Sequence, residues 1–228
     1  MNSTGGAASA LEVRRLGRTR YADAHRLQQE LVAARAEGRV VDALLATEHE
    51  DVVTLGRKSP PGDAAGVDMP VVAVERGGEA TWHGPGQVVL YPIVLLPEGR
   101  RDLHAWLRGL EQVVIDAMAD FGVEGRRVEG YTGVWIGDRK ACSIGVAVRR
   151  WTTWHGLALN VRADLARFAG FNPCGLDPRL MANLGDHAAC GLPEVEDRLV
   201  ARFVEFHRGW TGSQVRPPSA PESGRGAS

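Results

Sequence analysis

The sequence predicts an α+β fold, in which helices pack on a mixed, mostly antiparallel sheet. Two observations support this prediction. Three segments repeat apolar residues every three or four positions, as amphipathic helices do, whereas seven shorter segments are continuous or alternating apolar runs typical of strands. Helices and strands do not alternate regularly along the chain, which argues against a doubly wound parallel sheet.

Three segments are expected to be helices, and each has a signal at one of its ends. The first is Tyr21–Glu37, which Gly38 can end in a left-handed conformation. The second, Asp102–Phe121, has the longest apolar repeat and begins with an aspartate that can cap it. The third, Pro193–His207, starts with a proline, which suits the first turn of a helix.

The strands are expected between these helices, and tight turns join some of them. Gly137-Asp138-Arg139 is predicted to close one hairpin, and Arg149-Arg150-Trp151 the next. Successive hairpins favour antiparallel pairing. The predicted strands are Ala43–Thr47, Asp51–Leu55, Val71–Glu75, Gln87–Ile93, Gly133–Ile136, Ala141–Arg149 and Thr152–Val161.

Length and composition predict one domain between two disordered ends. The 228 residues suffice for a buried core, and no low-complexity linker divides residues 11–210. Residues 1–10 and 211–228 are rich in glycine, serine, alanine or proline and have little to bury, so both ends are expected to be disordered. We therefore expect a single domain over residues 11–210.

Charge and cysteine usage exclude several classes of protein. The chain has 27 basic and 28 acidic residues, so no basic excess favours nucleic-acid binding. No apolar run approaches the roughly 18 residues of a membrane span, and no signal peptide is recognised at the start. The three cysteines show no metal-ligand spacing, which indicates reduced thiols in the cytoplasm and no metal site.

Only two of the 27 basic residues are lysines, Lys58 and Lys140. Arginine does not deprotonate in a protein, whereas lysine can give and take a proton. Lys58 lies in a proline-rich loop and is expected to be a surface charge. Lys140 opens an apolar strand, where alternation would place it on one face with Cys142 and Ile144. The alternative for Lys140 is a surface position at the mouth of a hairpin.

Three further segments are candidates for a functional site. Arg76–Gln87 is rich in glycine and includes polar side chains, so it is either a ligand-binding loop or an ordinary hairpin loop. Cys174 lies in a Pro-Cys-Gly turn that would present its sulfur as a nucleophile, unless the thiol is simply packed. Neither Cys190 nor Cys142 lies between a proline and a glycine. His155 either orients a partner or is a satisfied histidine at a strand end.

Taken together, these motifs resemble one enzyme family. RGGxxTxHGPGQ at positions 76–87, followed by Tyr91-Pro92-Ile93, Lys140-x-x-x-Ile144-Gly145, His155-Gly-x-Ala-Leu-Asn160 and Pro173-Cys174-Gly175, is similar to the octanoyltransferases of lipoate biosynthesis. Thr54-Leu-Gly-Arg57 also fits, and the resemblance covers about residues 11–210. The chain departs from the family pattern at Ser143 and at Ala182-Asn183.

The resemblance implies a fold shared with the catalytic domain of biotin and lipoate protein ligases. It implies an acyltransferase in which Cys174 is the nucleophile and Lys140 the acid and base. A Lys140 ammonium would favour the Cys174 thiolate and later shuttle a proton, which arginine could not do. The residues implied to bind the acyl substrate are Arg76, Gly77, Gly78, Glu79, Ala80, Thr81, Trp82, His83, Ser143, Ile144, Gly145, Gly156, Leu157 and Ala158.

The implied partners follow from the same resemblance. The donor would be octanoyl-acyl carrier protein, and the acceptors would be lipoyl domains of 2-oxoacid dehydrogenase complexes and the glycine cleavage H protein. No cofactor, nucleic acid or membrane is expected. Two alternatives stay open: an ATP-dependent lipoate or biotin protein ligase of the same fold, and a non-catalytic module that binds acyl groups or proteins.

Overall fold

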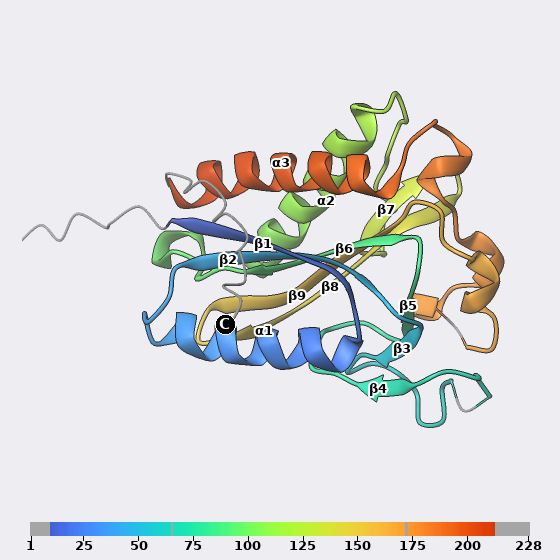
Figure 1. The fold of residues 1–228 in the computed structure, drawn as a ribbon, viewed down its shortest axis with the longest axis horizontal. Coiled ribbons are helices and arrows are strands. Elements are labelled where there is room, and N and C mark those ends of the chain that lie inside the picture. Colours follow the sequence, from blue (N-terminus) through green and yellow to red (C-terminus); the bar gives the residue numbers. More distant parts are fainter. Residues whose placement is uncertain (1–9, 65, 172, 213–228) are drawn as a thin grey trace, which may run out of the picture.

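A six-stranded sheet with the strand order β1-β2-β6-β9-β8-β7 forms the centre of the computed structural model, and a three-stranded sheet, β4-β3-β5, lies beside it (Figure 1). The structure describes residues 10–64, 66–171 and 173–212, except the side chain of Cys174. Within these, β1 and β2 are parallel, as are β3 and β4, and the other pairs are antiparallel. The mixed, mostly antiparallel sheet and the α+β class are therefore confirmed.

The strands are β1 (Leu11–Thr19), β2 (Asp42–His49), β3 (Val52–Leu55), β4 (Val71–Ala73), β5 (Thr81–His83), β6 (Gln87–Ile93), β7 (Gly133–Ile136), β8 (Arg139–Arg149) and β9 (Thr152–Asn160). The helices are α1 (Tyr21–Ala36), α2 (Leu103–Ala119) and α3 (Leu192–Thr211). Short 3-10 turns are η1 (Glu98–Arg100), η2 (Leu165–Phe168), η3 (Pro173–Gly175), η4 (Pro178–Leu180) and η5 (Leu184–Asp186).

Helices cover both faces of the large sheet, α1 on one side and α2 with α3 on the other (Figure 1). Alternate residues of β2 divide between two cores: Ala43 and Leu45 pack with α1, whereas Leu44 and Ala46 pack with α2 and α3. Because both faces are covered, the central strands are continuous apolar runs rather than alternating ones. A third core joins the small sheet to the segment after β9, with Trp82 against Phe168.

The predicted helices are confirmed, with small changes at their ends. The side chain of Asp102 accepts a hydrogen bond from the Ala105 backbone N–H and caps α2, as expected. Helix α3 continues past the predicted end at His207 to Thr211, and Gly212 ends it with φ +72°. The extra turn brings Trp210 onto Trp106 of α2, with ring centroids 5.4 Å apart. Disorder was expected over residues 1–10 and 211–228; it is wrong for Thr211 and Gly212, which end α3, whereas residues 1–9 and 213–228 lie outside the described residues.

Two strands were not predicted. Strand β1 contains three arginines among its nine residues and lies at the edge of the large sheet, where only Leu11 is fully buried, so its apolar signal is weak. Strand β5 is only three residues long and lies inside the glycine-rich segment, where the sequence predicts a loop. Both predicted tight turns are confirmed, because Gly137-Asp138 joins β7 to β8 and Arg150-Trp151, with positive φ values, joins β8 to β9.

The predicted face of Lys140 is right for Ile144, which lines the same cavity, but wrong for Cys142, because β8 contains an irregularity. Strand β7 pairs Val134 with Cys142 and Trp135 with Lys140, so Ala141 is an extra residue in the register. Such a bulge reverses the alternation on one side of it. Consequently Cys142 packs with Ala141 in the core under α2, whereas the Lys140 side chain lies over the Trp135 ring.

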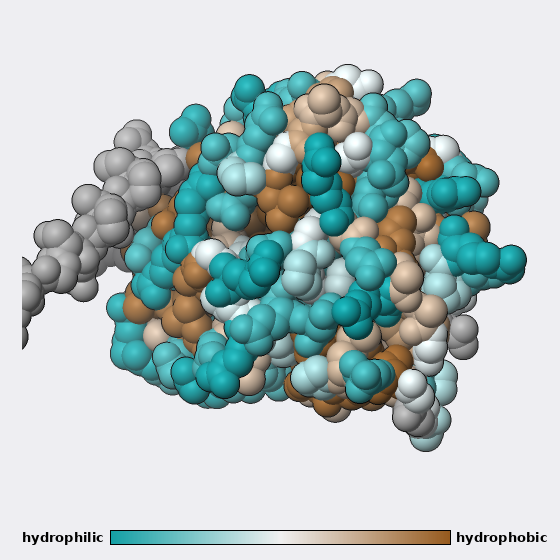
Figure 2. Space-filling view, turned by 45° about the vertical axis from the view of Figure 1, so that its right-hand side comes forward, coloured by the Kyte–Doolittle hydropathy of each residue, from teal (hydrophilic) through white to brown (hydrophobic). Residues whose placement is uncertain are grey.

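The surface in Figure 2 is largely hydrophilic, with hydrophobic side chains in separate patches. None of the helices in the described part of the chain combines the length and the apolar character that crossing a membrane requires.

Candidate active site

A cavity of about 340 Å³ lies where β5, β8 and β9 meet the glycine-rich segment. Pockets of this size suit small ligands. All the residues predicted to bind the acyl substrate line it, except Ala80 and Trp82. The cavity wall also includes Lys140, one of the two predicted catalytic residues. Residues that line the cavity but were not predicted to bind substrate are Tyr21, Lys58, Tyr91, Leu107, Gly130, Tyr131, Thr132, Val146 and His155.

Arg76 organises the glycine-rich segment from the inside. Its guanidinium is buried and donates hydrogen bonds to the Thr54 carbonyl at 2.8 Å, the Thr54 hydroxyl at 2.9 Å and the Glu79 carbonyl at 2.7 Å. The backbone N–H of Gly77 donates to the Val146 carbonyl at 3.0 Å, which anchors the segment to β8. Arg76 therefore shapes this wall through main-chain contacts.

Alternation along β5 explains which of its residues reach the cavity. Thr81 and His83 face the cavity, whereas Trp82 faces the third core and donates a hydrogen bond from Nε1 to Asp51. Ala80, just before the strand, is also in that core. Burial in the first place, and then the nearby charges, lower the pKa of His83 well below its usual value, so its ring is neutral near pH 7.

Lys140 is 2% exposed and lines the cavity. Its ammonium lies over the Trp135 ring, 5.2 Å from the centroid, and no carboxylate of the described residues forms an ion pair with it. A buried ammonium without a carboxylate is costly unless it faces a polar space or a reacting group. The surface alternative for Lys140 is therefore excluded. The other lysine, Lys58, is exposed as expected, yet it also lines the cavity.

The backbone around Cys174 adjoins the same cavity. Cys174 lies in η3, and a Cβ added to its neighbour Gly175 would lie 2.6 Å from the Glu79 carboxylate, so the two residues are in close contact. Gly175 has φ +70°, a conformation that favours glycine. Further along, the Ala182 backbone N–H donates to the Lys140 carbonyl at 2.9 Å. The nucleophile predicted at Cys174 thus belongs to a segment attached at both places to cavity-lining residues, while its side chain lies outside the described atoms.

The two glycines of β8 and β9 leave the floor of the cavity without side chains at their positions. Gly145 pairs directly with Gly156, and Ile144 pairs with Leu157. A Cβ on Gly156 would overlap the carbonyl oxygen of Leu90 in β6. The apolar side chains and the backbone of this floor suit a hydrocarbon chain.

A polar aromatic cluster closes the cavity on the side of α1. His49 contacts the Tyr91 hydroxyl through Nε2 at 2.7 Å, and Tyr21 stacks on His83 with centroids 6.0 Å apart. Burial lowers the pKa of His49 to about 4 and raises that of Tyr91, so both groups are neutral near pH 7. The sequence has no local signal for this cluster, because its members come from α1, β2, β5 and β6.

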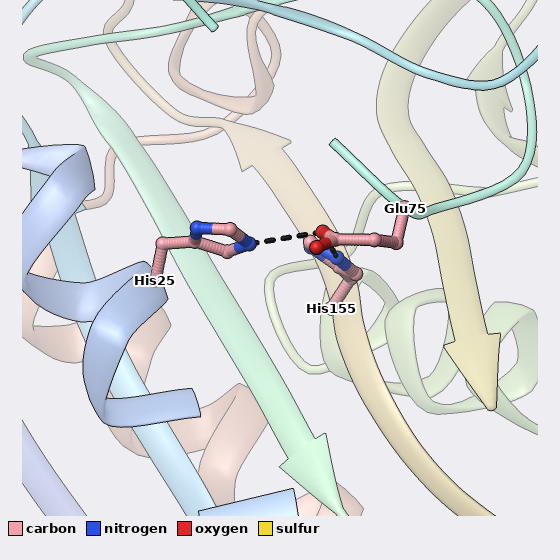
Figure 3. Close-up of side chains that lie close together, drawn as sticks. All are labelled: His25, Glu75 and His155. Carbon is pink, nitrogen blue, oxygen red and sulfur yellow. Dashed lines mark hydrogen bonds and ion pairs between the residues drawn. The ribbon is translucent and has the colours of Figure 1, made fainter. Parts of the chain in front are cut away.

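One group in the described residues has the geometry to hold a metal ion: His25, Glu75 and His155 (Figure 3). The sequence allows His155 to be either a histidine that orients a partner or a satisfied histidine at a strand end. Its backbone has φ +55°, which is unusual for a side chain-bearing residue. Its pKa is lowered to about 3, first by burial.

Known proteins with similar sequences identify the family that this chain matches. The family model "Lipoyl protein ligase A/B catalytic domain" matches residues 20–204. An octanoyltransferase of Geobacter sulfurreducens is 48% identical over 205 residues, which cover 89% of this chain and 87% of that protein.

Solved structures show the same fold. Lipoate-protein ligase A bound with ATP is similar with a TM-score of 0.70 and 17% identity, over 94% of this chain and 90% of that one. The biotin protein ligase of Aquifex aeolicus in complex with biotin and ATP is similar with a TM-score of 0.52 and 12% identity, over 89% and 72% of the two chains. The expected relation to the fold of biotin and lipoate protein ligases is confirmed.

Proposed function

This chain belongs to the family of the lipoyl protein ligase A/B catalytic domain and is an octanoyltransferase within it, and on that premise we propose that it moves an octanoyl or lipoyl group from acyl carrier protein to a lysine of lipoyl domains. The acceptors are the lipoyl domains of 2-oxoacid dehydrogenase complexes and the glycine cleavage H protein. The observation that supports this proposal most directly is the buried Lys140 in the wall of a cavity with an apolar floor.

In the first step, the Cys174 thiolate attacks the carbonyl carbon of the donor thioester. A new C–S bond to Cys174 forms, the bond to the carrier's sulfur breaks, and Lys140 gives a proton to the departing thiolate. The enzyme then has an octanoyl thioester on Cys174 and a neutral Lys140. The contact of Gly175 with Glu79 supports this step, because it brings the backbone next to Cys174 against the cavity wall.

In the second step, the amine of the acceptor lysine attacks the Cys174 thioester. Lys140 takes the proton that the amine loses, an amide bond forms, and Cys174 leaves as thiolate. The starting charges of both residues are restored, and no ATP is consumed because the donor is already activated. The Gly77 N–H is committed to Val146, which leaves the Gly78 and Gly175 N–H groups as the candidates to stabilise the tetrahedral oxyanion.

Intact-mass spectrometry after mixing the chain with octanoyl-acyl carrier protein tests this mechanism. The wild-type chain should gain one octanoyl group that hydroxylamine removes, and Cys174→Ala should gain none. Cys190→Ala is the matched control, because Cys190 is buried away from the cavity lining and should leave the adduct intact. An adduct on Cys174→Ala would overturn the assignment, and ATP–pyrophosphate exchange by the wild-type chain would indicate a ligase instead.

A further inference from the structure

Three side chains from distant parts of the chain converge beside the cavity: His25 from α1, Glu75 from the segment after β4, and His155 from β9 (Figure 3). His25 Nε2 lies 3.0 Å from Glu75 Oε2, and His155 Nε2 lies 3.5 Å from the same oxygen. We propose that these three side chains bind one divalent transition-metal ion, with Zn²⁺ as the best chemical match.

The separations between the ligand atoms fit one ion. Zinc bonds to imidazole nitrogen and carboxylate oxygen measure about 2.0–2.2 Å, so two ligands at a tetrahedral angle lie about 3.3 Å apart. The two observed distances, 3.0 and 3.5 Å, lie on either side of that value, and all three ligand atoms lie within 4.8 Å of one another. Small side-chain rotations therefore suffice to replace the His25–Glu75 hydrogen bond with bonds to a shared ion.

His155 is held in position before any ligand arrives. The residue is 2% exposed, and its buried Nε2 makes no hydrogen bond within the described residues beyond the long 3.5 Å contact with Glu75 Oε2. Its backbone N–H donates to Oε1 of the buried Gln28 at 2.9 Å, which supports the left-handed φ of +55°. A strained backbone at a side chain whose buried nitrogen is poorly satisfied is typical of a binding position. An ion at this place would replace the long contact of Nε2 with a metal bond.

Stacked rings hold His25 in a similar way. Its ring stacks with those of Tyr21 and Trp154, each with a centroid 5.7 Å away, and lies 5.6 Å from that of His155. These contacts restrict rotation of the ring, so Nε2 stays directed at Glu75. Preorganised ligands lose little conformational freedom when an ion binds.

The donor set determines which ion fits. Two imidazoles and one carboxylate suit zinc and its first-row neighbours, whereas calcium and magnesium prefer oxygen-only sites. The Glu75 side chain is 47% exposed, which gives the ion a route from solvent and leaves a fourth position for water. Because His155 also lines the cavity, the ion would connect α1, the Glu75 segment and β9 at the cavity wall.

Calorimetric titration of the chelator-treated, full-length chain with zinc chloride tests the proposal. We expect one ion per chain and a higher melting temperature with zinc. His25→Gln and Glu75→Gln should each weaken binding at least about tenfold, since even residues behind a metal ligand change affinity by about 10–100-fold. Equal affinity in the wild-type chain and in both variants would overturn the site. Melting temperatures without metal show whether each variant is folded.

Two control variants separate this site from other zinc ligands. His104→Gln removes an exposed histidine on α2 and should leave the affinity unchanged. Cys174→Ala should also keep it, so the metal site can be present even if the acyl-enzyme mechanism is wrong. Loss of binding in either control would assign the ion to an adventitious ligand and overturn the proposal. With Co²⁺ in the wild-type chain, a tetrahedral spectrum without thiolate charge-transfer bands supports the site, and thiolate bands contradict it.

Discussion

The backbone carbonyl of Lys140 accepts a hydrogen bond from the backbone N–H of Ala182, 2.9 Å away. Met181 also bridges to Lys140 in parallel pairing, so the chain that follows Cys174 is attached to the strand that contains the buried lysine. This attachment holds two segments that are distant in the sequence, the Pro173-Cys174-Gly175 turn and the start of β8, in a fixed position relative to each other. This attachment uses main-chain atoms, so a substitution of the Lys140 side chain leaves it in place.

Lys140→Arg should therefore lose transfer activity almost as completely as Lys140→Ala, by at least about 100-fold, while the fold is retained. The physical reason is that arginine keeps the charge but does not exchange protons near neutral pH, and positioned acid–base groups contribute about 10²–10⁴-fold. Turnover of octanoyl-acyl carrier protein with a lipoyl-domain acceptor measures the effect. Lys58→Arg, the other lysine replacement, should keep most of the activity. Retained activity in Lys140→Arg would show that charge alone matters.

Arg76→Lys should lower the free energy of unfolding by about 2–4 kcal/mol. The guanidinium donates to the carbonyl and hydroxyl of Thr54 and to the Glu79 carbonyl, and a single ammonium cannot reproduce that planar arrangement. Urea denaturation measures the change. Arg57→Lys, at an exposed arginine nearby, should change the free energy very little. If both variants are equally stable, the guanidinium does not support this cavity wall.

Gly156→Ala should destabilise the chain by about 3 kcal/mol, because overpacking at a central strand forces the backbone to move. The new methyl would overlap the Leu90 carbonyl oxygen and lie 2.7 Å from Pro92 Cδ. Thermal unfolding tests this against Gly99→Ala, where the added Cβ meets open space. A melting temperature of Gly156→Ala equal to that of the control would mean that β6 and β9 can separate without cost.

Stability should fall as the pH is lowered from about 6.5 to about 4, in part because of His49. Burial lowers the pKa of this histidine to about 4 in the folded chain, below the roughly 6.5 of an unfolded one. Between these values the unfolded state binds more protons, so stability rises with pH and levels off above about 6.5, and the loss at low pH reaches about 3 kcal/mol. Urea denaturation at several pH values measures the slope.

His49→Gln should flatten that slope, although the variant will be less stable at neutral pH because contacts to Tyr91 and Thr19 change. His104→Gln, at an exposed position, should leave the slope as it is in the wild-type chain. A slope that is the same in His49→Gln and the wild type would assign the pH dependence to other groups.

Much of the secondary structure was predictable, because its signals are local. Apolar periodicity marked α1, α2 and α3, and short turns such as Gly137-Asp138 marked the hairpins. The missed strands show the limit of this reasoning. β1 is an arginine-rich edge strand whose pairing with β2 supplies the order that its own pattern does not indicate, and β5 is too short for a periodicity to be seen.

The candidate site was predictable only where its residues lie in continuous motifs. The segment from Arg76 to His83 and the turn at Cys174 can be recognised in the sequence. Tyr91 and Tyr21 cannot be assigned to the cavity in this way, because they reach it from separate elements. His49 does not line the cavity but contacts the Tyr91 hydroxyl. The His25–Glu75–His155 group has no spacing that the sequence could reveal, since contacts between α1 and β9 depend on how the helix packs on the sheet.

The sequence by itself determined the α+β class, the three helices and the segments that contain the chemistry, because these depend on local periodicity, turn residues and motif order. The tertiary structure alone decided on which side Lys140 lies: the extra residue Ala141 reverses the alternation of β8, so the lysine enters the cavity and Cys142 enters the core. A bulge is a property of the pairing between two strands, and the pattern of one strand does not contain it.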